Sequence, residues 1–308
     1  MKAEEHTDIL VVGHYVHDTL IGPDGERHET LGGPPAYISA ILDGSDATYS
    51  VIAKVGGDFK YPQEVRHAPI TVSESFTTAF VNDYSHGKRR QSVDAICDPI
   101  YPDDLSGCAT VGLACGVFNE ILPETLLRLR ETCDILVADI QGFLRVRHED
   151  HSVGYLDIED TPYAGILEQV DFLKVSTDEA RFVKIESLRK RTQIVLTKGE
   201  HGCHLYERDG VHRVPGNSVI ARDETGAGDC FIAGFAWGLS KGFDVLHAAR
   251  LGNRCGALAV RHVGIPRISK GEIDALVEQE VLPDSGLHGS DLRNRVQDSG
   301  LSSHCGLG

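Results

Sequence analysis

The stretch Asp223-Glu224-Thr225-Gly226-Ala227-Gly228-Asp229, together with the apolar run behind it, decides the fold of this 308-residue chain. Thr225 is a candidate N-cap, and the run Cys230-Phe231-Ile232-Ala233-Gly234-Phe235 predicts a buried helix that ends near Gly242. A helix leaves its first backbone N–H groups unpaired, and small residues there let a ligand approach them closely. The start of this helix is therefore a candidate anion site, with Asp229 placed to take a proton from a nucleophile.

Strands alternate with helices over most of the chain. The apolar run 9–13 predicts a buried strand, and further strands are expected at 49–55, 109–113, 135–139, 172–175 and 193–197. Helices are expected from the Gly32-Gly33-Pro34-Pro35 turn to Leu42, and at 123–132, 178–183, 247–262 and 270–280. This spacing predicts right-handed crossovers in a mostly parallel sheet.

Two segments depart from the alternation. Residues 14–31 predict a hairpin, and residues 71–100 predict half-exposed strands at 77–81 and 90–96 around a turn. Strands without an intervening helix suit an antiparallel flap, so the two segments are expected to form one small β lid. A further hairpin is expected across 204–214.

Composition limits the partners and the compartment. A formal net charge of −16 argues against nucleic acid or an anionic membrane, but not against an anionic nucleotide bound by backbone amides. The eight cysteines form no C-x-x-C pair, which favours buried reduced thiols over disulfides. No signal peptide or membrane span is visible, so a cytosolic protein is expected, with the nucleus as the alternative. Residues 283–308, rich in Ser, Gly and Asp, predict a disordered tail.

The string D-x-T-G-A-G-D before an apolar helix resembles the C-terminal signature of the pfkB carbohydrate kinases, the ribokinase family. Gly32-Gly33 before a helix resembles the N-terminal signature of the same family. The resemblance implies an α/β, ribokinase-like three-layer fold, with a mostly parallel sheet flanked by helices, in a kinase domain at 1–282. It also implies ATP and Mg²⁺, with Asp229 as the base and the amides of Gly226, Ala227 and Gly228 stabilising the transferred phosphoryl group.

The same resemblance assigns the remaining site residues. The expected substrate-binding residues are Asp18, Gly32, Gly33, Tyr37 and Asp229, and Glu179 is expected to help hold Mg²⁺ through water. The expected nucleotide-binding residues are Ser176, Thr197, Gly199, Gly202, Gly226, Ala227, Gly228 and Asn253.

Simpler roles stay open for four of these residues. Asp18 could be a turn residue, and Asn253 could be an exposed helical side chain. Ser176 and Glu179 could form a capping box, since Ser176 replaces the family's usual asparagine. Glu224 also departs from the pattern. These two departures leave a non-catalytic binding or regulatory protein as the second hypothesis.

Resemblance to one subgroup of the family indicates which acceptor to expect. Within the family, the strings at 13–18, 29–33, 121–126 and 139–141 look most like plant-type myo-inositol kinases. Tyr37, where sugar kinases carry an asparagine, implies a pocket reshaped for a cyclitol. The expected partners are therefore a small polyol such as myo-inositol and ATP, with ribose, fructose or a nucleoside such as adenosine as alternatives. A monomer and a lid-mediated homodimer both remain open, and the H-x-x-H spacings are not expected to form a zinc site.

Overall fold

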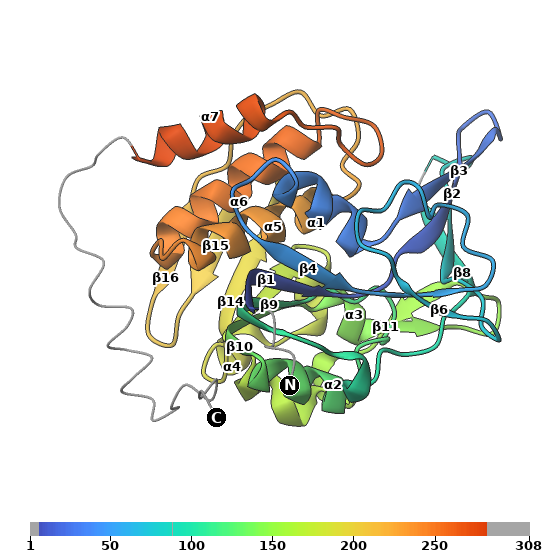
Figure 1. Cartoon of the computed structure of the whole chain (residues 1–308), viewed down its shortest axis with the longest axis horizontal. Helices are drawn as coiled ribbons and strands as arrows, with labels where there is room; N and C mark the ends of the chain where they lie inside the picture. The colour runs from blue at the N-terminus through green and yellow to red at the C-terminus, as the bar shows by residue number, and fades with distance from the viewer. Residues whose placement is uncertain (1–5, 88, 282–308) are drawn as a thin grey trace.

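The computed structural model describes residues 6–87 and 89–281, and the predicted tail at 283–308 lies outside them. Within these residues the centre is an eight-stranded sheet of order β16-β15-β14-β13-β10-β9-β1-β4 (Figure 1). Neighbours from β14 to β4 are parallel, and β15 and β16 add an antiparallel hairpin at one edge. The strands are β1 (His6–Val12), β4 (Tyr49–Ile52), β9 (Cys108–Ala114), β10 (Cys133–Asp139), β13 (Phe172–Ser176), β14 (Gln193–Thr197), β15 (Cys203–Tyr206) and β16 (Val211–Val214).

Helices cover both faces of this sheet. One face carries α1 (Pro34–Leu42), α5 (Ala227–Ser240), α6 (Val245–Ala259) and α7 (Lys270–Val281), and Figure 1 shows α2 on the opposite side. The opposite face carries α2 (Pro123–Glu131), α3 (Gln141–Leu144), α4 (Ile185–Leu188) and short 3₁₀ segments at 102–104, 158–160, 164–169 and 179–182. In β1, Ile9 and Val11 pack under α5 while Leu10 and Val12 pack toward α2. Burial on both faces explains why this strand is continuously apolar. The predicted three-layer fold is confirmed.

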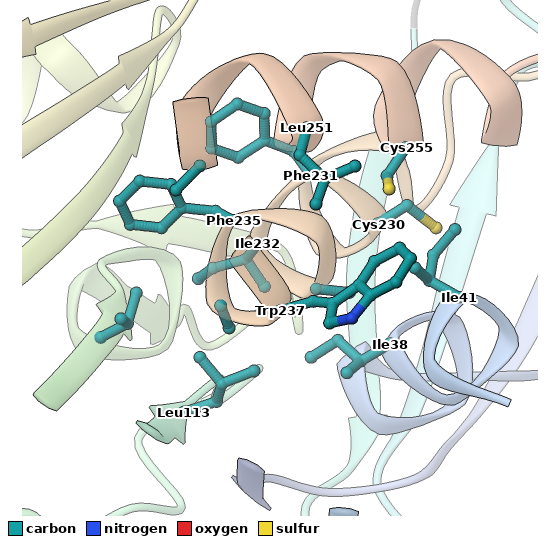
Figure 2. Packing of buried hydrophobic residues seen from close by; sticks show 14 of the residues in the cluster. Ile38, Ile41, Leu113, Cys230, Phe231, Ile232, Phe235, Trp237, Leu251 and Cys255 are labelled. Carbon is teal, nitrogen blue, oxygen red and sulfur yellow. The ribbon is translucent and has the colours of Figure 1, made fainter. Parts of the chain in front are cut away.

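Helix α5 is buried on all sides, from Cys230 to Leu239. Figure 2 shows Trp237 facing Ile38 of α1, while Phe231 points toward Leu251 of α6. The indole Nε1 of Trp237 donates a hydrogen bond of 3.0 Å to Asp46. A helix that is apolar all round must lie inside the protein, and this packing fixes where its first turn points.

A second, four-stranded sheet of order β3-β2-β7-β8 projects from the side of the molecule (Figure 1). It joins the two segments that were expected to form a lid, because β2 pairs with β7, but this pairing is parallel, so the expected flap is not antiparallel throughout. The strands are β2 (Val16–Ile21), β3 (Arg27–Gly32), β7 (Ala79–Asp83) and β8 (Arg90–Ala95). Two short pairs complete the β structure of the described residues: β5 (Lys54–Gly56) with β6 (Ile70–Val72), and β11 (Arg145–Arg147) with β12 (Val153–Tyr155).

The structure corrects three local predictions. The single strand expected at 49–55 divides at Ala53, because β4 pairs with β1 while β5 pairs with β6. The helix expected at 178–183 is a 3₁₀ segment at 179–182, followed by α4. Thr225 does not cap α5, because Gly226 is the N-cap and offers no side chain. The local sequence pattern could not predict these three features, because each depends on which hydrogen-bond partners the backbone finds in the folded chain.

All seven cysteines in the described residues are buried, as predicted, and Cys97, Cys115, Cys133, Cys203, Cys230 and Cys255 are free thiols, while Cys305 lies outside. No helix among the residues described has the length and apolar character needed to cross a membrane.

Candidate active site

The carboxyl ends of the central parallel strands meet at one edge of the sheet. Asp139 ends β10, Ser176 ends β13 and Thr197 ends β14, and the register places Asp139 beside Lys174 and Ser176 beside Thr197. Ligands of open α/β sheets bind outside this edge. The first turn of α5 contacts Lys174 here, so the predicted anion site and the strand ends belong to one region.

The first turn of α5 presents unpaired amides. Gly226 adopts a left-handed conformation with φ of 75°, and the helix begins at Ala227. In the described part of the chain, the N–H groups of Gly226, Gly228 and Asp229 have no hydrogen-bond partner. The Ala227 amide differs, because it donates to the carbonyl of Glu224 at 3.2 Å. The cradle of free amides is therefore Gly226, Gly228 and Asp229, at the positive end of a 14-residue helix.

Two side chains fill the space beside the glycines of this cradle. A Cβ atom on Gly226 would overlap the ring of Tyr37, and one on Gly228 would lie 2.9 Å from the Nζ of Lys174. Gly226 is thus required by the Tyr37 ring, whereas a side chain at Gly228 would displace the tip of the flexible Lys174 side chain. The sequence argument, in which small residues serve only the approach of a ligand, missed this reason.

Asp229 lies in a charged setting. The residue is half-buried, and the enclosure of its carboxyl group, with Asp139 and Glu179 adding to the effect, raises its pKa to about 7. Lys174 and Arg145 oppose this rise in pKa. A carboxylate with a pKa near 7 is suited to accept a proton at neutral pH.

Beneath the cradle lies a buried ion pair. The Nζ of Lys174 donates a hydrogen bond of 2.9 Å to Oδ2 of Asp139, and the two residues are 5% and 0% exposed. Although burial opposes it, Asp139 and then Glu179 raise the pKa of Lys174. Lys174 is therefore a fixed positive charge in this site. Sequence reasoning missed it, and the signal available was a lysine within an otherwise apolar strand.

Glu179 and Ser176 form the reciprocal capping arrangement that was left open. The Ser176 amide donates to Oε2 of Glu179 at 2.7 Å, and the Glu179 amide donates to Oγ of Ser176 at 3.3 Å. Glu179 is buried, yet Lys174 and hydrogen bonding with Ser176 lower its pKa overall. It is thus an ionised carboxylate with one oxygen engaged by the backbone.

Asp18 lies where the lid sheet meets the core. A Cβ atom on Gly32 would overlap Oδ2 of Asp18, so this glycine makes room for the carboxylate. Burial raises the pKa of Asp18 to about 6, against Arg89 and Arg145. Gly33 has φ of 92°, and a side chain there would strike the backbone of His14. Asp18 is in paired strand β2 opposite Thr30, so the turn alternative is wrong.

Asn82 of the lid forms hydrogen bonds with several polar side chains, and the sequence analysis did not identify it. Its Nδ2 donates to Oδ1 of Asp18 at 3.4 Å, and its Oδ1 accepts from Arg89 at 2.7 and 2.9 Å and from Gln91 at 3.1 Å. The bond from Nδ2 links the Asp18 carboxylate of β2 to the neighbouring lid strand β7. Period-2 polar residues on a half-exposed strand were the only signal in the sequence.

Arg145 is the second cation of the site and was also missed. Its Nη1 donates to the carbonyl of Val117 at 3.1 Å and its Nη2 to Gln141 at 3.0 Å, while its buried Nε has no partner among the described residues. The guanidinium lies 5.6 Å from the centre of the Phe80 ring in the lid. It acts electrostatically on Asp18 and Asp229 together, so the structure brings these two carboxylates into one region.

The expected nucleotide-binding residues come from adjoining elements. Gly199 and Gly202 have φ of 56° and 83°, and a Cβ on Gly202 would overlap the carbonyl of Val214. Asn253 is 9% exposed and donates to the carbonyl of Pro215 at 3.1 Å, so the exposed-helix alternative is wrong. Asn253 of α6 thus fastens the loop against which the 197–202 turn packs.

The residues described contain no group of three or more His, Cys, Asp or Glu side chains arranged to hold a metal ion.

Taken together, a ribokinase-like core, a β lid and a helix start with free amides beside Asp229 define a small-molecule kinase. Residues 153–267 match the sequence profile of the pfkB family carbohydrate kinases. The chain is 40% identical to the inositol 3-kinase of Arabidopsis thaliana over 268 residues, 84% of this chain and 75% of that protein. It is also 40% identical to the inositol 3-kinase of Zea mays over 290 residues, 87% and 76% of the two chains.

Solved structures show the same fold. A pyrophosphate-dependent kinase of the ribokinase family, complexed with a pyrophosphate analog and myo-inositol, matches with a TM-score of 0.72 at 22% identity, covering 87% of this chain and 99% of that one. The ribokinase of Thermotoga maritima matches with a TM-score of 0.64 at 20% identity, covering 88% and 99%. The chain belongs to the pfkB carbohydrate kinase family, whose members transfer a phosphoryl group to a hydroxyl group.

Proposed function

We propose that this protein is an ATP-dependent myo-inositol kinase that phosphorylates the 3-hydroxyl and forms an inositol monophosphate. The observation that supports it most directly is the placement of Asp229 in the first turn of α5, directly beside the free amides of Gly226 and Gly228. The likeness to the inositol 3-kinases over most of the chain supports the acceptor and the position. The domain at 1–282, with its lid from 14–31 and 71–100, is the unit to which we assign this activity.

The chemistry follows from the arrangement of the site. The acceptor hydroxyl lies against Asp229, which takes its proton while the oxygen attacks the terminal phosphorus of ATP. The bond from that phosphorus to the bridging oxygen breaks, and ADP leaves. Negative charge on the transferred phosphoryl group is met by the cradle amides and the positive end of α5. Asp18 accepts hydrogen bonds from neighbouring hydroxyls of the acceptor. The lid excludes water, which would otherwise compete as the nucleophile.

Magnesium fits this site only in a hydrated form. Glu179 is an ionised carboxylate with one free oxygen, and the described residues supply no cluster of three ligands. Mg²⁺ keeps several waters and binds through donor phosphates in such sites. Glu179 would hold it through water, and the ion would neutralise phosphate charge.

The donor and the acceptor each have a competitor. The matched inositol-bound structure is that of a pyrophosphate-dependent enzyme, which makes pyrophosphate the alternative donor. Fructose is the alternative acceptor, since several shorter matches are fructokinases. A non-catalytic role is disfavoured, because a pure binding protein has no use for a carboxylate with a pKa near 7 beside free amides.

The test combines an acceptor panel with one variant. Purified protein is assayed with myo-inositol, fructose, ribose and adenosine, each with ATP or pyrophosphate, and the product position is read by NMR. We expect myo-inositol with ATP to give the highest kcat/KM. A sugar that exceeds myo-inositol ten-fold in kcat/KM would refute the acceptor.

The variant Asp229→Asn tests the base. We expect a loss in kcat of about 10²–10⁴-fold with substrate binding retained. Its control is Asp209→Asn, an exposed hairpin residue outside the site, which should leave the rate unchanged. Near-normal turnover by Asp229→Asn would refute the assignment of Asp229 as the base.

A further inference from the structure

The Lys174–Asp139 ion pair places a positive charge close to the carboxylate of Asp229. One ammonium lies among three carboxylates, since Asp139, Glu179 and Asp229 all act electrostatically on Lys174. The ammonium donates a hydrogen bond to Asp139, at 2.9 Å. Its Nζ also lies 2.9 Å from the place that a Cβ atom would take on Gly228, the residue directly before the base. An ammonium this close to Asp229 would otherwise be free to pair with it.

We propose that Asp139 and Lys174 are a positioning pair for phosphoryl transfer, in which Lys174 supports the amide cradle from beneath Gly228 and Asp139 holds the ammonium away from Asp229. The inference rests on the proposed function, in that Asp229 is its base. Neither residue needs to touch the acceptor. Their part is to keep a positive charge under the transferred phosphoryl group without neutralising the carboxylate that must accept the proton.

Three observations support this arrangement. Asp139 is fully buried and comes from β10, while Lys174 comes from the adjacent strand β13 at the paired register position. The rigid sheet therefore fixes the ion pair. The amide of Gln141 donates to Oδ1 of Asp139 at 3.2 Å, so both oxygens of Asp139 are engaged. The space that a side chain at Gly228 would take is filled by the ammonium.

The charge around Asp229 comes from several elements. The groups that face it are Asp139 from β10, Lys174 from β13, Glu179 after β13, Arg145 after α3, Tyr37 from α1, Cys115 after β9 and the neighbouring Cys230. Tyr37, Cys115 and Cys230 are buried neutral groups whose pKa values are raised by burial. The charges of Lys174 and Asp139 can therefore be changed by substitution while Arg145, which also acts on Asp18, is left unaltered.

The test uses opposite charge changes. Lys174→Gln removes the positive charge but keeps a donor for Asp139, and Asp139→Asn removes the negative charge but keeps an acceptor for Lys174. The acidic limb of the profile is the rise of kcat/KM with pH as Asp229 ionises. We expect Lys174→Gln to move this limb to higher pH by about 1 unit or more, because the positive charge that favours the ionised form is lost. Asp139→Asn should move that limb to lower pH and lower the plateau kcat at least ~10-fold, because the freed ammonium pairs with the base. A purely structural pair would not shift the limb in opposite directions.

A second variant tests the same idea through the backbone. Gly228→Ala lies inside a helix, where alanine is favoured, so the protein should still fold. The added methyl group displaces the ammonium, and the acidic limb should move to higher pH as in Lys174→Gln. The control is the pair of buried Lys54 and half-buried Asp104, joined at 2.6 Å in a different part of the chain. Lys54→Gln and Asp104→Asn should lower the melting temperature and leave the limb in place.

The outcomes separate the two proposals. Absence of activity on myo-inositol in the unaltered protein would refute the proposed acceptor. The titration of the Asp229 carboxyl carbon, followed by ¹³C NMR with Asp229→Asn as the assignment control, would then still decide the charge arrangement. Limbs or titrations that stay fixed in Lys174→Gln and Asp139→Asn, or that move in the same direction, would overturn the positioning pair.

Discussion

Gly226 and Gly242 offer a controlled test of what fills the space at the start of α5. They lie just before and just after this helix with φ of 75° and 78°. A Cβ on Gly226 would overlap the Tyr37 ring, whereas a Cβ on Gly242 would meet no atom within 4 Å. The two Gly→Ala variants therefore share the same backbone cost and differ in the neighbour.

The expected magnitudes follow from that difference. Gly242→Ala should lower the free energy of unfolding by about 1–2 kcal/mol, the cost of an L-residue in left-handed backbone. Gly226→Ala should lose a further ~1–3 kcal/mol, because the buried ring must move. It should also lower kcat, because the clash with the Tyr37 ring displaces the Gly226 amide from its place in the cradle. Gly242→Ala should retain full kcat.

The assay is urea denaturation with kinase kinetics on the same preparations. A double-mutant cycle with Tyr37→Ala completes it, because removing the ring should return ~1 kcal/mol or more of the Gly226→Ala loss. Equal destabilisation by the two glycine variants, or no coupling with Tyr37, would refute the packing argument.

Four further predictions concern the site. The kcat/KM of the unaltered protein should rise with pH around a midpoint of about 7, because Asp229 accepts a proton only when ionised; a midpoint near pH 4 would contradict this. The folded-state pKa of Asp229 is raised, so ionising this residue destabilises the folded protein. Asp229→Asn should therefore raise the free energy of unfolding at pH 8 by about 1–4 kcal/mol, measured by urea titration. This gain should vanish below about pH 4, where Asp229 is protonated in both the folded and the unfolded protein. Asn253→Ala, which loses the bond to Pro215, should raise the KM for the nucleotide more than the KM for the acceptor, and the reverse order in steady-state kinetics would count against that role. Asp18→Asn should raise the KM for the acceptor while the nucleotide KM stays the same, and an equal rise in both would argue against acceptor binding.

The order of elements and the helix at 227–240 could be predicted from sequence because both rest on local chemistry. Glycine, proline and the period of apolar residues act within a few positions of themselves. The same is true of Asp229, whose place in a helix start follows from the string that contains it. Strand boundaries were less accessible, as the division at Ala53 shows, because pairing depends on a partner far along the chain.

The sequence by itself determined the fold class and the residues that open α5. Tertiary structure alone decided that Tyr37 and Lys174 occupy the space beside Gly226 and Gly228, that Arg145 links Asp18 electrostatically to Asp229, and that the Ala227 amide is already bonded. The physical reason is distance along the chain: backbone propensity is set by immediate neighbours. The charge and packing around a carboxylate are set by whichever strands the sheet places next to it.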